Sequence, residues 1–268
     1  MSFNEKLKRA WAESGSLLCV GLDPDMDKLP ETAKQASLPI FHFCRAIVDA
    51  TADLVCAFKP QIAYFHAAGA EHDLEALIDY MRDRYPRIPI ILDAKRGDIG
   101  STAKQYAHEA FDRYRADAVT ANPYMGGDSL QPFLDYADRG IFLLCRTSNP
   151  GGADVQELEV AGRPVYEHVA EMAANKWNAH NNIGLVVGAT QPQPLRRVRA
   201  LIGDMPLLVP GVGSQGGDPR AVLEAASTSN GTGLIVNVSR AVLYAGQGAD
   251  YADEARKKAQ QIRESLKG

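Results

Sequence analysis

Acidic and basic side chains alternate at one point in the sequence, directly after a run of apolar residues. Ile91 and Leu92 are followed by Asp93, Ala94 and Lys95. Side chains of a β-strand alternate between its two faces, so Asp93 and Lys95 would share one face and their apolar neighbours the other. An inward-facing aspartate and lysine are costly unless they are paired or used. The spacing therefore predicts a paired charge cluster inside the fold.

Two further charges lie in similar surroundings. Lys59 is part of a second apolar run, and Asp23 ends the first one. We expect a row of alternating charges that contains Lys59, Asp93 and Lys95 and extends to Asp98. At about 4 Å and an effective dielectric constant of about 20, each contact is on the order of 4 kcal/mol, which holds the lysines protonated and the aspartates ionised. A salt-bridge network that only closes the fold is the alternative, but charges gathered at strand ends favour catalysis.

Eight short apolar runs recur along the chain, each followed by polar or glycine residues and then by a helix-like stretch. Near-continuous runs of Leu, Ile and Val are typical of parallel strands that are covered on both faces. The predicted strands span residues 16–20, 55–59, 89–93, 118–122, 141–146, 184–188, 207–210 and 234–238. Helical periodicity is clearest over residues 70–85, 102–114, 165–178 and 250–266.

This alternation predicts an α/β fold, a (β/α)8 TIM barrel, with a short N-terminal helix before the first strand and residues 1–268 forming one domain. A doubly wound open sheet is the alternative. That fold normally has a glycine-rich phosphate loop after its first strand, which the segment from Gly21 to Pro24 lacks. Barrel active sites lie where strands end, and the charges described above fall there.

A second set of residues points to an anion. Gly211, Gly213, Gly216 and Gly217 follow the seventh predicted strand and would let backbone N–H groups approach a phosphate. Arg240 comes just after the eighth strand and could hold phosphate oxygens in a bidentate manner. Barrels often bind phosphate between these two loops. A flexible connection is the alternative for the glycine-rich loop, and Arg240 at the matching place favours a phosphate site.

The composition narrows the class of protein. The chain has 268 residues, 23% of them charged, and a net charge of −4, which gives no indication of binding to nucleic acid or to acidic membranes. Four scattered cysteines without a C-x-x-C pair suggest reduced thiols in a cytoplasmic protein. The sequence contains no apolar run long enough to span a membrane, no signal peptide and no histidine spacing typical of a metal site.

At these residues the sequence resembles the orotidine 5′-monophosphate decarboxylases. The pattern Asp-x-Lys-x-x-Asp-Ile-x-x-Thr of that family is matched at every position by Asp93, Lys95, Asp98, Ile99 and Thr102. The resemblance covers nearly the whole chain, and the stretches 146–151 and 237–241 are similar to the longer bacterial branch. Many members have a glycine before the phosphate-binding arginine, where this chain has a serine.

The resemblance implies decarboxylation of orotidine 5′-monophosphate to UMP in pyrimidine biosynthesis, with no cofactor and no metal. Lys95 would protonate the carbanion at carbon 6 of the pyrimidine ring as CO₂ leaves. Asp93 would lie beside the substrate carboxylate. Lys59 would orient Asp93 and, with Asp23, bind the ribose.

The remaining family positions would complete the site. Ser148 would contact the pyrimidine ring, and Gln215 and Arg240 would hold the 5′-phosphate. In the family, the second aspartate and the residues that follow it reach across a homodimer interface. The resemblance therefore implies that Asp98, Ile99 and Thr102 complete the active site of the partner subunit.

Three other functions remain open. Sugar-phosphate enzymes of the same superfamily, such as 3-keto-gulonate 6-phosphate decarboxylase or hexulose 6-phosphate synthase, use magnesium and an acidic ligand at the position of Lys59, which would repel a cation. An aldolase that forms a Schiff base would need a neutral lysine, whereas Asp93 and Asp98 favour a charged Lys95. A barrel that binds a phosphate ligand without turnover would use the charges only structurally.

Overall fold

A parallel β-barrel forms the centre of the molecule. The structure is a computed structural model that describes residues 1–213 and 216–267, and within these residues eight strands form one parallel sheet in the order β2-β1-β10-β9-β8-β5-β4-β3. Isolated bridges from Phe58 to Ile90 and from Gln61 to Asp93 join the two edge strands and close the ring. The strands are β1 (Leu18–Leu22), β2 (Ala57–Pro60), β3 (Ile91–Arg96), β4 (Ala118–Ala121), β5 (Gly140–Arg146), β8 (Ile183–Val187), β9 (Leu207–Pro210) and β10 (Leu234–Val238).

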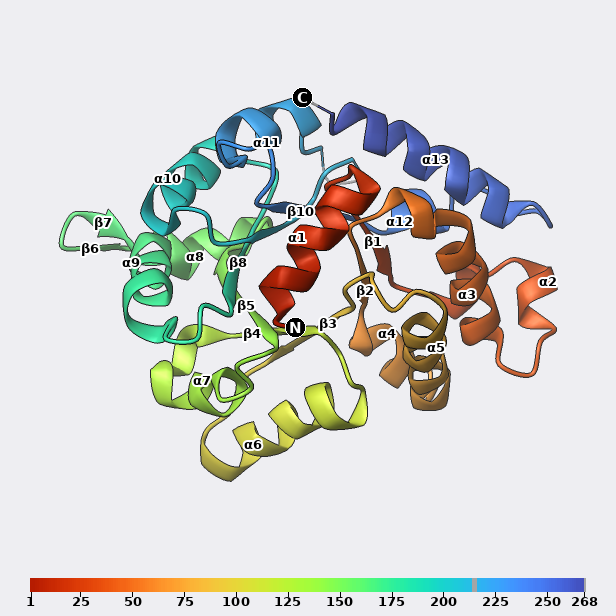
Figure 1. The fold of residues 1–268 in the computed structure, drawn as a ribbon, viewed down its shortest axis with the longest axis horizontal. Helices are drawn as coiled ribbons and strands as arrows, with labels where there is room; N and C mark the ends of the chain where they lie inside the picture. The colour runs from red at the N-terminus through yellow and green to blue at the C-terminus, as the bar shows by residue number, and fades with distance from the viewer. Residues whose placement is uncertain (214–215, 268) are drawn as a thin grey trace.

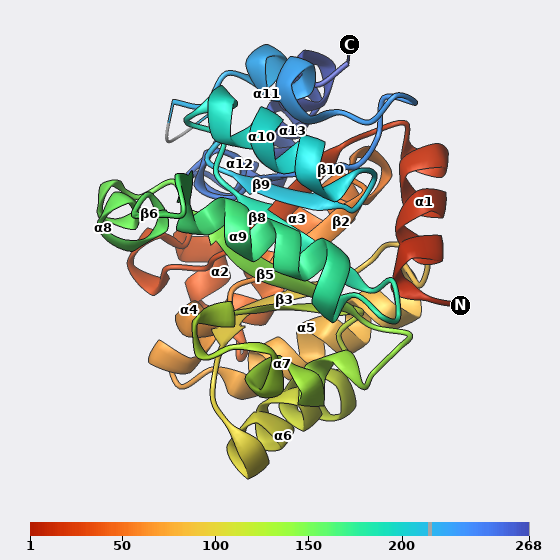
Figure 2. The same ribbon diagram turned by 90° about the vertical axis from the view of Figure 1, so that its left-hand side faces the viewer.

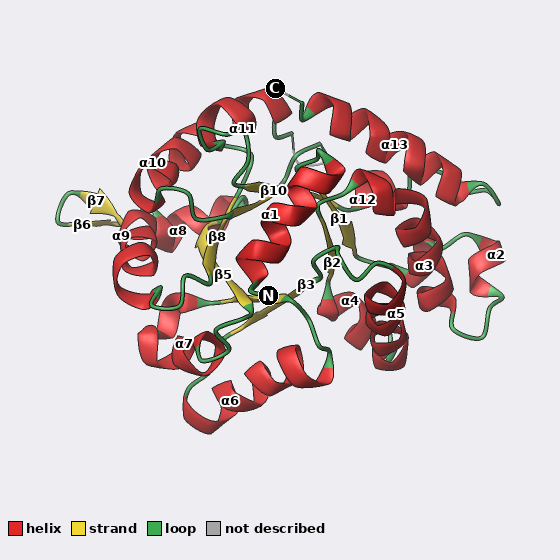
Figure 3. Cartoon of the chain, viewed as in Figure 1, coloured by secondary structure: helices red, strands yellow, loops and turns green. Residues whose placement is uncertain are grey.

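Helices surround this ring on the outside (Figures 1 and 3). They are α1 (Phe3–Ser14), α2 (Glu31–Lys34), α3 (Pro39–Thr51), α4 (Ile62–Ala67), α5 (Glu71–Arg84), α6 (Gly100–His108), α7 (Gly127–Leu134), α8 (Ala153–Gln156), α9 (Val165–Met172), α10 (Pro192–Ile202), α11 (Pro219–Ala226), α12 (Arg240–Leu243) and α13 (Tyr251–Ser265). Turns of π-helix over Glu109–Arg113 and Ala173–Trp177 continue α6 and α9.

The predicted (β/α)8 barrel with its N-terminal helix is confirmed, and the doubly wound alternative is wrong. Each predicted strand overlaps an observed one. The first lies two residues later than predicted, because Ser16 caps its start by accepting a hydrogen bond from the N–H of Leu18 at 3.1 Å. The small hairpin of β6 (Glu159–Val160) and β7 (Arg163–Pro164) was not predicted, because two-residue strands on the surface leave no apolar run.

The core consists of the strands and the inner faces of the helices. All residues of β1, β4, β8 and β10 are buried, as expected for strands covered on both sides. The four cysteines lie in this core and form no disulfide. None of the helices in the described part of the chain is long and apolar enough to cross a membrane.

Helix α1 closes the barrel at the ends where the strands begin (Figures 1 and 2). A capping box of Ser2 and Glu5 starts the helix. Phe3 packs edge-on against Phe142 with 5.7 Å between ring centroids, and Trp11 donates a hydrogen bond of 2.9 Å to the carbonyl of Leu234. The barrel is therefore open only at the opposite end, where the strands finish.

A buried ion pair attaches α1 to the barrel. Lys6 Nζ lies 2.7 Å from Asp117 Oδ2, an atom that also accepts a hydrogen bond from the N–H of Ile90 at 2.9 Å. Arg82 and Arg139 lie farther from the other oxygen of this carboxylate, at 3.9 and 4.0 Å. Asp117 thus links the helix to the starts of neighbouring strands.

We expect Lys6→Ala to lower the free energy of unfolding by about 1–3 kcal/mol, the range for a buried polar group that loses its partner. Urea denaturation measures this change. Lys8→Ala is the matched control, because Lys8 is an exposed lysine in the same helix. Equal losses in the two variants would contradict a specific contribution from the Lys6 ion pair.

Candidate active site

A cavity of about 160 Å³ opens at the end of the barrel where the strands finish. The charged residues Asp23, Lys59, Asp93 and Lys95 line it, and Arg240 lines it from the last strand–helix connection. They come from β2, β3 and the segments that follow β1 and β10, which are far apart in the sequence and adjacent in the barrel. The two sets of residues expected from the sequence therefore share one cavity.

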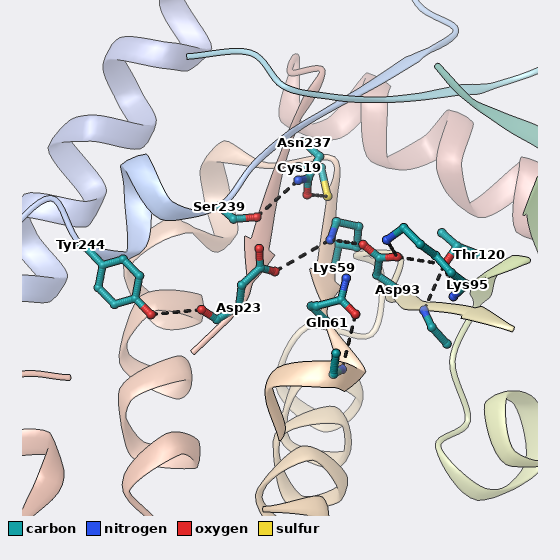
Figure 4. Close-up of polar contacts among 12 residues, drawn as sticks. Cys19, Asp23, Lys59, Gln61, Asp93, Lys95, Thr120, Asn237, Ser239 and Tyr244 are labelled. Carbon is teal, nitrogen blue, oxygen red and sulfur yellow. Dashed lines mark hydrogen bonds and ion pairs between the residues drawn. The ribbon is translucent and has the colours of Figure 1, made fainter. Parts of the chain in front are cut away.

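The charges form an alternating row across β1, β2 and β3 (Figure 4). Lys59 Nζ lies 2.7 Å from Asp93 Oδ2 and 3.9 Å from Asp23 Oδ1. Lys95 Nζ lies 2.6 Å from Asp93 Oδ1. Only 4% of the Lys59 side chain is exposed, against 47% for Lys95. The inner lysine is thus enclosed by carboxylates, while the outer one reaches the cavity.

Burial and neighbouring charges have opposite effects on the pKa values of Asp93 and Lys59. Burial by itself would raise the pKa of Asp93, but the ammonium groups of Lys59 and Lys95 outweigh it and hold that pKa well below its usual range. Burial would lower the pKa of Lys59, but the carboxylates of Asp93 and Asp23 outweigh it and raise that pKa. Both groups therefore stay charged at neutral pH.

Strand β3 departs from regular pairing at the site. Its register with β4 runs from Leu92 opposite Val119 directly to Arg96 opposite Ala121. Lys95, within this irregular segment, has a φ of 47°, in the left-handed region that side chains other than glycine rarely adopt. The predicted alternation of faces therefore stops at Lys95, and the β-bulge, rather than strand geometry, aims its side chain.

Thr120 of β4 lies opposite this bulge and was not identified from the sequence. Its Oγ1 accepts hydrogen bonds from the N–H groups of Ala94 at 3.0 Å and Lys95 at 2.9 Å. It also contacts Asp93 Oδ1 at 2.9 Å (Figure 4). A single threonine in a buried strand gives no signal of its own in the sequence, because its partners are set by strand register.

Asp23 is positioned through its backbone. The hydroxyl of Tyr244 donates to the carbonyl of Asp23 at 3.0 Å and accepts from the N–H of Asp25 at 2.7 Å. Asp23 Oδ1 is buried and accepts no hydrogen bond within the described residues. This oxygen is an available acceptor at the edge of the cavity. Tyr244 was not identified from the sequence either, since it lies in a helical region far along the chain from the Asp93 motif.

Arg240 begins α12, just after β10, the strand that neighbours β1, and it is exposed at the cavity. Its guanidinium makes no hydrogen bond or ion pair within residues 1–213 and 216–267. The preceding Ser239 accepts a hydrogen bond from Asn237 Nδ2 at 3.3 Å and packs so closely on β1 that a side chain at Gly21 would collide with it. The guanidinium is therefore free to bind an anion.

The described glycines after β9 include three with positive φ, which glycine adopts without the steric cost that a Cβ brings. Gly211, Gly213 and Gly216 have φ values of 102°, 80° and 86°. A Cβ on Gly217 would lie 2.6 Å from the Cβ of Ala189, so this position must be small. Gln215, predicted to bind phosphate, lies outside the described residues.

Ser148 lies after β5 and next to the end of β8, where a Cβ on Gly188 would be 2.8 Å from the Ser148 Cβ. The structure does not extend the charge row to Asp98. The carboxylate of Asp98 instead accepts the N–H of Ile99 at 2.8 Å, and no ion pair joins it to Lys95 among the described residues. The Ile99 and Thr102 side chains are exposed and do not line the cavity.

No group of three or more His, Cys, Asp or Glu residues in the described part of the chain is arranged to hold a metal ion. Metal independence stays a prediction that needs a measurement.

Known proteins are similar to this chain along almost its full length. Residues 16–255 match the model of the Orotidine 5′-phosphate decarboxylase / HUMPS family. A relative from Cupriavidus necator, named orotidine 5′-phosphate decarboxylase, is 61% identical over 99% of this chain and 98% of its own. A relative of the same name from Ralstonia nicotianae is 60% identical over the same shares. The structure of Leishmania donovani OMP decarboxylase superposes with a TM-score of 0.82, at 42% identity, over 98% of this chain and 99% of its own.

We expect Lys59→Met to lower the free energy of unfolding at neutral pH by about 1–3 kcal/mol, because Asp93 and Asp23 lose a buried cation. In the wild type the depressed pKa of Asp93 contributes stability that is present above the unfolded pKa and lost as the pH falls. The variant lacks much of that contribution. The difference between the two proteins should therefore shrink as the pH is lowered from neutral.

Urea denaturation at neutral pH and at pH values below about 4, the pKa of an aspartate in the unfolded chain, measures both effects. Lys257→Met is the control, because Lys257 pairs with Glu254 on the surface of α13. A difference between wild type and Lys59→Met that stays constant or grows towards acid would contradict the ionised, stabilising role of Asp93.

Proposed function

Because this chain belongs to the orotidine 5′-phosphate decarboxylase / HUMPS family, we propose that it converts orotidine 5′-monophosphate to UMP and CO₂ by electrostatic catalysis with its own side chains. The observation that carries the proposal is the row Asp23–Lys59–Asp93–Lys95 in a cavity that Arg240 also lines. These are the charges that an anionic nucleotide losing a carboxylate requires.

The chemical step breaks the bond between carbon 6 of the pyrimidine and the carboxylate carbon. The electron pair stays on carbon 6, CO₂ leaves, and Lys95 Nζ donates a proton to the carbanion. The carbanion cannot delocalise onto a neighbouring carbonyl or imine, so a preorganised ammonium is the main source of stabilisation. The partial exposure of Lys95 towards the cavity and its 2.6 Å contact with Asp93 support this role.

Asp93 has the opposite effect on the ground state. Its carboxylate, held ionised by two ammonium groups, would lie beside the carboxylate that leaves. Like charges repel, and the repulsion disappears as neutral CO₂ forms. Lys59 keeps Asp93 charged and oriented through the 2.7 Å contact, so the carboxylate does not escape the repulsion by taking up a proton.

The ribose and the phosphate of the nucleotide would bind to other residues of the same cavity. Asp23 Oδ1, a buried acceptor without a hydrogen bond, suits a ribose hydroxyl. Arg240, whose guanidinium has no partner within residues 1–213 and 216–267, suits the 5′-phosphate. Gln215 would contribute to the same phosphate site, and Ser148 would contact the pyrimidine. Since the phosphate is remote from carbon 6, its binding energy serves to position the substrate.

The alternatives fit the site less well. A magnesium-dependent sugar-phosphate reaction would place a cation next to Lys59, which is buried and already paired with two carboxylates. A Schiff-base mechanism needs a neutral amine, whereas Lys95 lies 2.6 Å from a carboxylate. A purely structural role for the row gives no reason for the Arg240 guanidinium to line the same cavity.

We extend the proposal to a homodimer with shared active sites. Ile99, Tyr124 and Met125 are large apolar side chains that are 58%, 83% and 42% exposed, on the connections that follow β3 and β4. Covering such residues is favourable in an interface between subunits. Asp98 and Thr102 belong to the same region as Ile99 and would contact substrate in the partner subunit. The chain would act as one domain, in the cytoplasm, where its four unpaired thiols stay reduced.

Lys95→Ala should reduce turnover by several orders of magnitude in a folded protein, because the proton donor is lost. Loss of orotidine 5′-monophosphate absorbance measures turnover, with Lys257→Ala as a surface control. A rate in Lys95→Ala above about a tenth of the wild-type rate would refute Lys95 as the acid, because it corresponds to a barrier only ~1.4 kcal/mol higher.

EDTA should leave wild-type activity unchanged in the same assay. A loss of activity in EDTA that magnesium restores would favour the sugar-phosphate alternative.

Subunit exchange tests the shared site. Lys95→Ala and Asp98→Ala proteins should each be inactive, and mixing them should restore about a quarter of wild-type activity, since half of the random dimers carry one intact site. Both variants must first be shown to dimerise and to exchange subunits. Exchange without any return of activity would mean that Asp98 acts within its own subunit.

A further inference from the structure

Thr120 of β4 lies opposite the β-bulge of β3. Between the paired positions Leu92–Val119 and Arg96–Ala121, three residues of β3 lie opposite Thr120 alone. All three contact its hydroxyl: Asp93 through its side chain, and Ala94 and Lys95 through their N–H groups. One oxygen atom of β4 therefore holds the whole segment that carries the two reacting charges.

The hydrogen-bond capacity of the hydroxyl fixes the direction of each bond. A threonine Oγ1 has one proton to donate and two lone pairs to accept with. The N–H groups of Ala94 at 3.0 Å and Lys95 at 2.9 Å can only donate, so they occupy both lone pairs. The proton of Thr120 must then point to Asp93 Oδ1 at 2.9 Å. That oxygen also accepts from Lys95 Nζ at 2.6 Å.

The bonds to the backbone matter because Lys95 is strained. Its φ of 47° is unfavourable for a side chain with a Cβ, and the bulge has removed the regular ladder with β4. Such a conformation persists only where its surroundings impose it. Two N–H groups donating to one buried oxygen impose it here, since only a turned backbone lets consecutive N–H groups point the same way.

We propose that Thr120 is a positioning residue for the decarboxylation, whose hydroxyl holds Lys95 in its left-handed conformation and fixes the orientation of Asp93. This inference rests on the proposed function, since it concerns the same proton donor and the same carboxylate. Thr120 acts through these two residues. A purely structural role, that of filling space in the cavity wall, would be served equally well by valine.

The test compares Thr120→Val, which keeps the shape and removes the hydroxyl, with Thr120→Ser, which keeps the hydroxyl. Thr51→Val is the matched control, because Thr51 is a buried threonine whose hydroxyl bonds only to the carbonyl of Ile47 in its own helix, at 2.7 Å. Steady-state kinetics with orotidine 5′-monophosphate give kcat and KM, and calorimetry gives the Kd for UMP.

We expect kcat of Thr120→Val to fall about 10- to 100-fold, the effect of misplacing a catalytic group by about 1 Å. The Kd for UMP should stay within about threefold of the wild-type value, because ribose and phosphate bind elsewhere. Thr120→Ser should retain kcat within about threefold of the wild type, and Thr51→Val should be unchanged. If Thr120→Val does not fold, Thr120→Ala replaces it in the comparison with Thr120→Ser.

Three results in the Thr120 variants would overturn the inference. A Thr120→Val protein with at least half of the wild-type kcat would mean that the hydroxyl is dispensable. A Thr120→Ser protein as slow as Thr120→Val would mean that side-chain shape, and not the hydroxyl, is required. A rise in KM and Kd at unchanged kcat would make Thr120 a binding residue. Absence of turnover in the wild type would refute the proposed function, and this inference with it.

Discussion

The site depends on one buried ammonium group. Lys59 lies between Asp93 and Asp23, almost fully removed from solvent, and each of the three charges would be unfavourable there without the others. Their mutual attraction keeps Asp93 ionised inside a barrel wall, where burial alone would neutralise it. The proposed chemistry needs a carboxylate that stays charged next to an anionic substrate. The same interaction therefore stabilises the buried charges in the folded barrel and keeps Asp93 in the form that the reaction requires.

The barrel provides this arrangement by separating its two ends. At the end where the strands begin, α1 contributes Phe3, Trp11 and the Lys6–Asp117 pair, and fills the opening. At the other end, the charged residues Asp23, Lys59, Asp93, Lys95 and Arg240 line the cavity. The strained backbone of Lys95 lies at this second end. In the bulge, the N–H groups of Ala94 and Lys95 donate to Thr120 Oγ1 and do not take part in regular strand pairing.

Substrate recognition would be divided between the row and the last loops. Arg240 and the glycine-rich segment after β9 lie on the side of the cavity formed by the last strands, and the reacting charges on the side formed by the first. Because the rigid barrel connects these two sides of the cavity, binding of the phosphate would also position carbon 6 next to Lys95.

The sequence by itself determined the barrel, the approximate limits of its strands, and the meeting of Asp23, Lys59, Asp93, Lys95 and Arg240 at one end. These features could be predicted because strands buried on both faces form continuous apolar runs, and because all parallel strands of a barrel finish on the same side. The motif around Asp93 is local, so its residues are adjacent in any fold that contains it.

The tertiary structure alone decided how those residues are oriented. It placed Asp23, rather than Asp98, at the end of the charge row, turned Lys95 through a left-handed bulge, and brought Thr120 and Tyr244 to positions that hold Asp93 and Asp23. Each of these depends on the register between strands, or on contacts between residues far apart in the chain. Local hydrophobic patterns do not encode register at a bulge, since the alternation of side chains on which they rely is interrupted there.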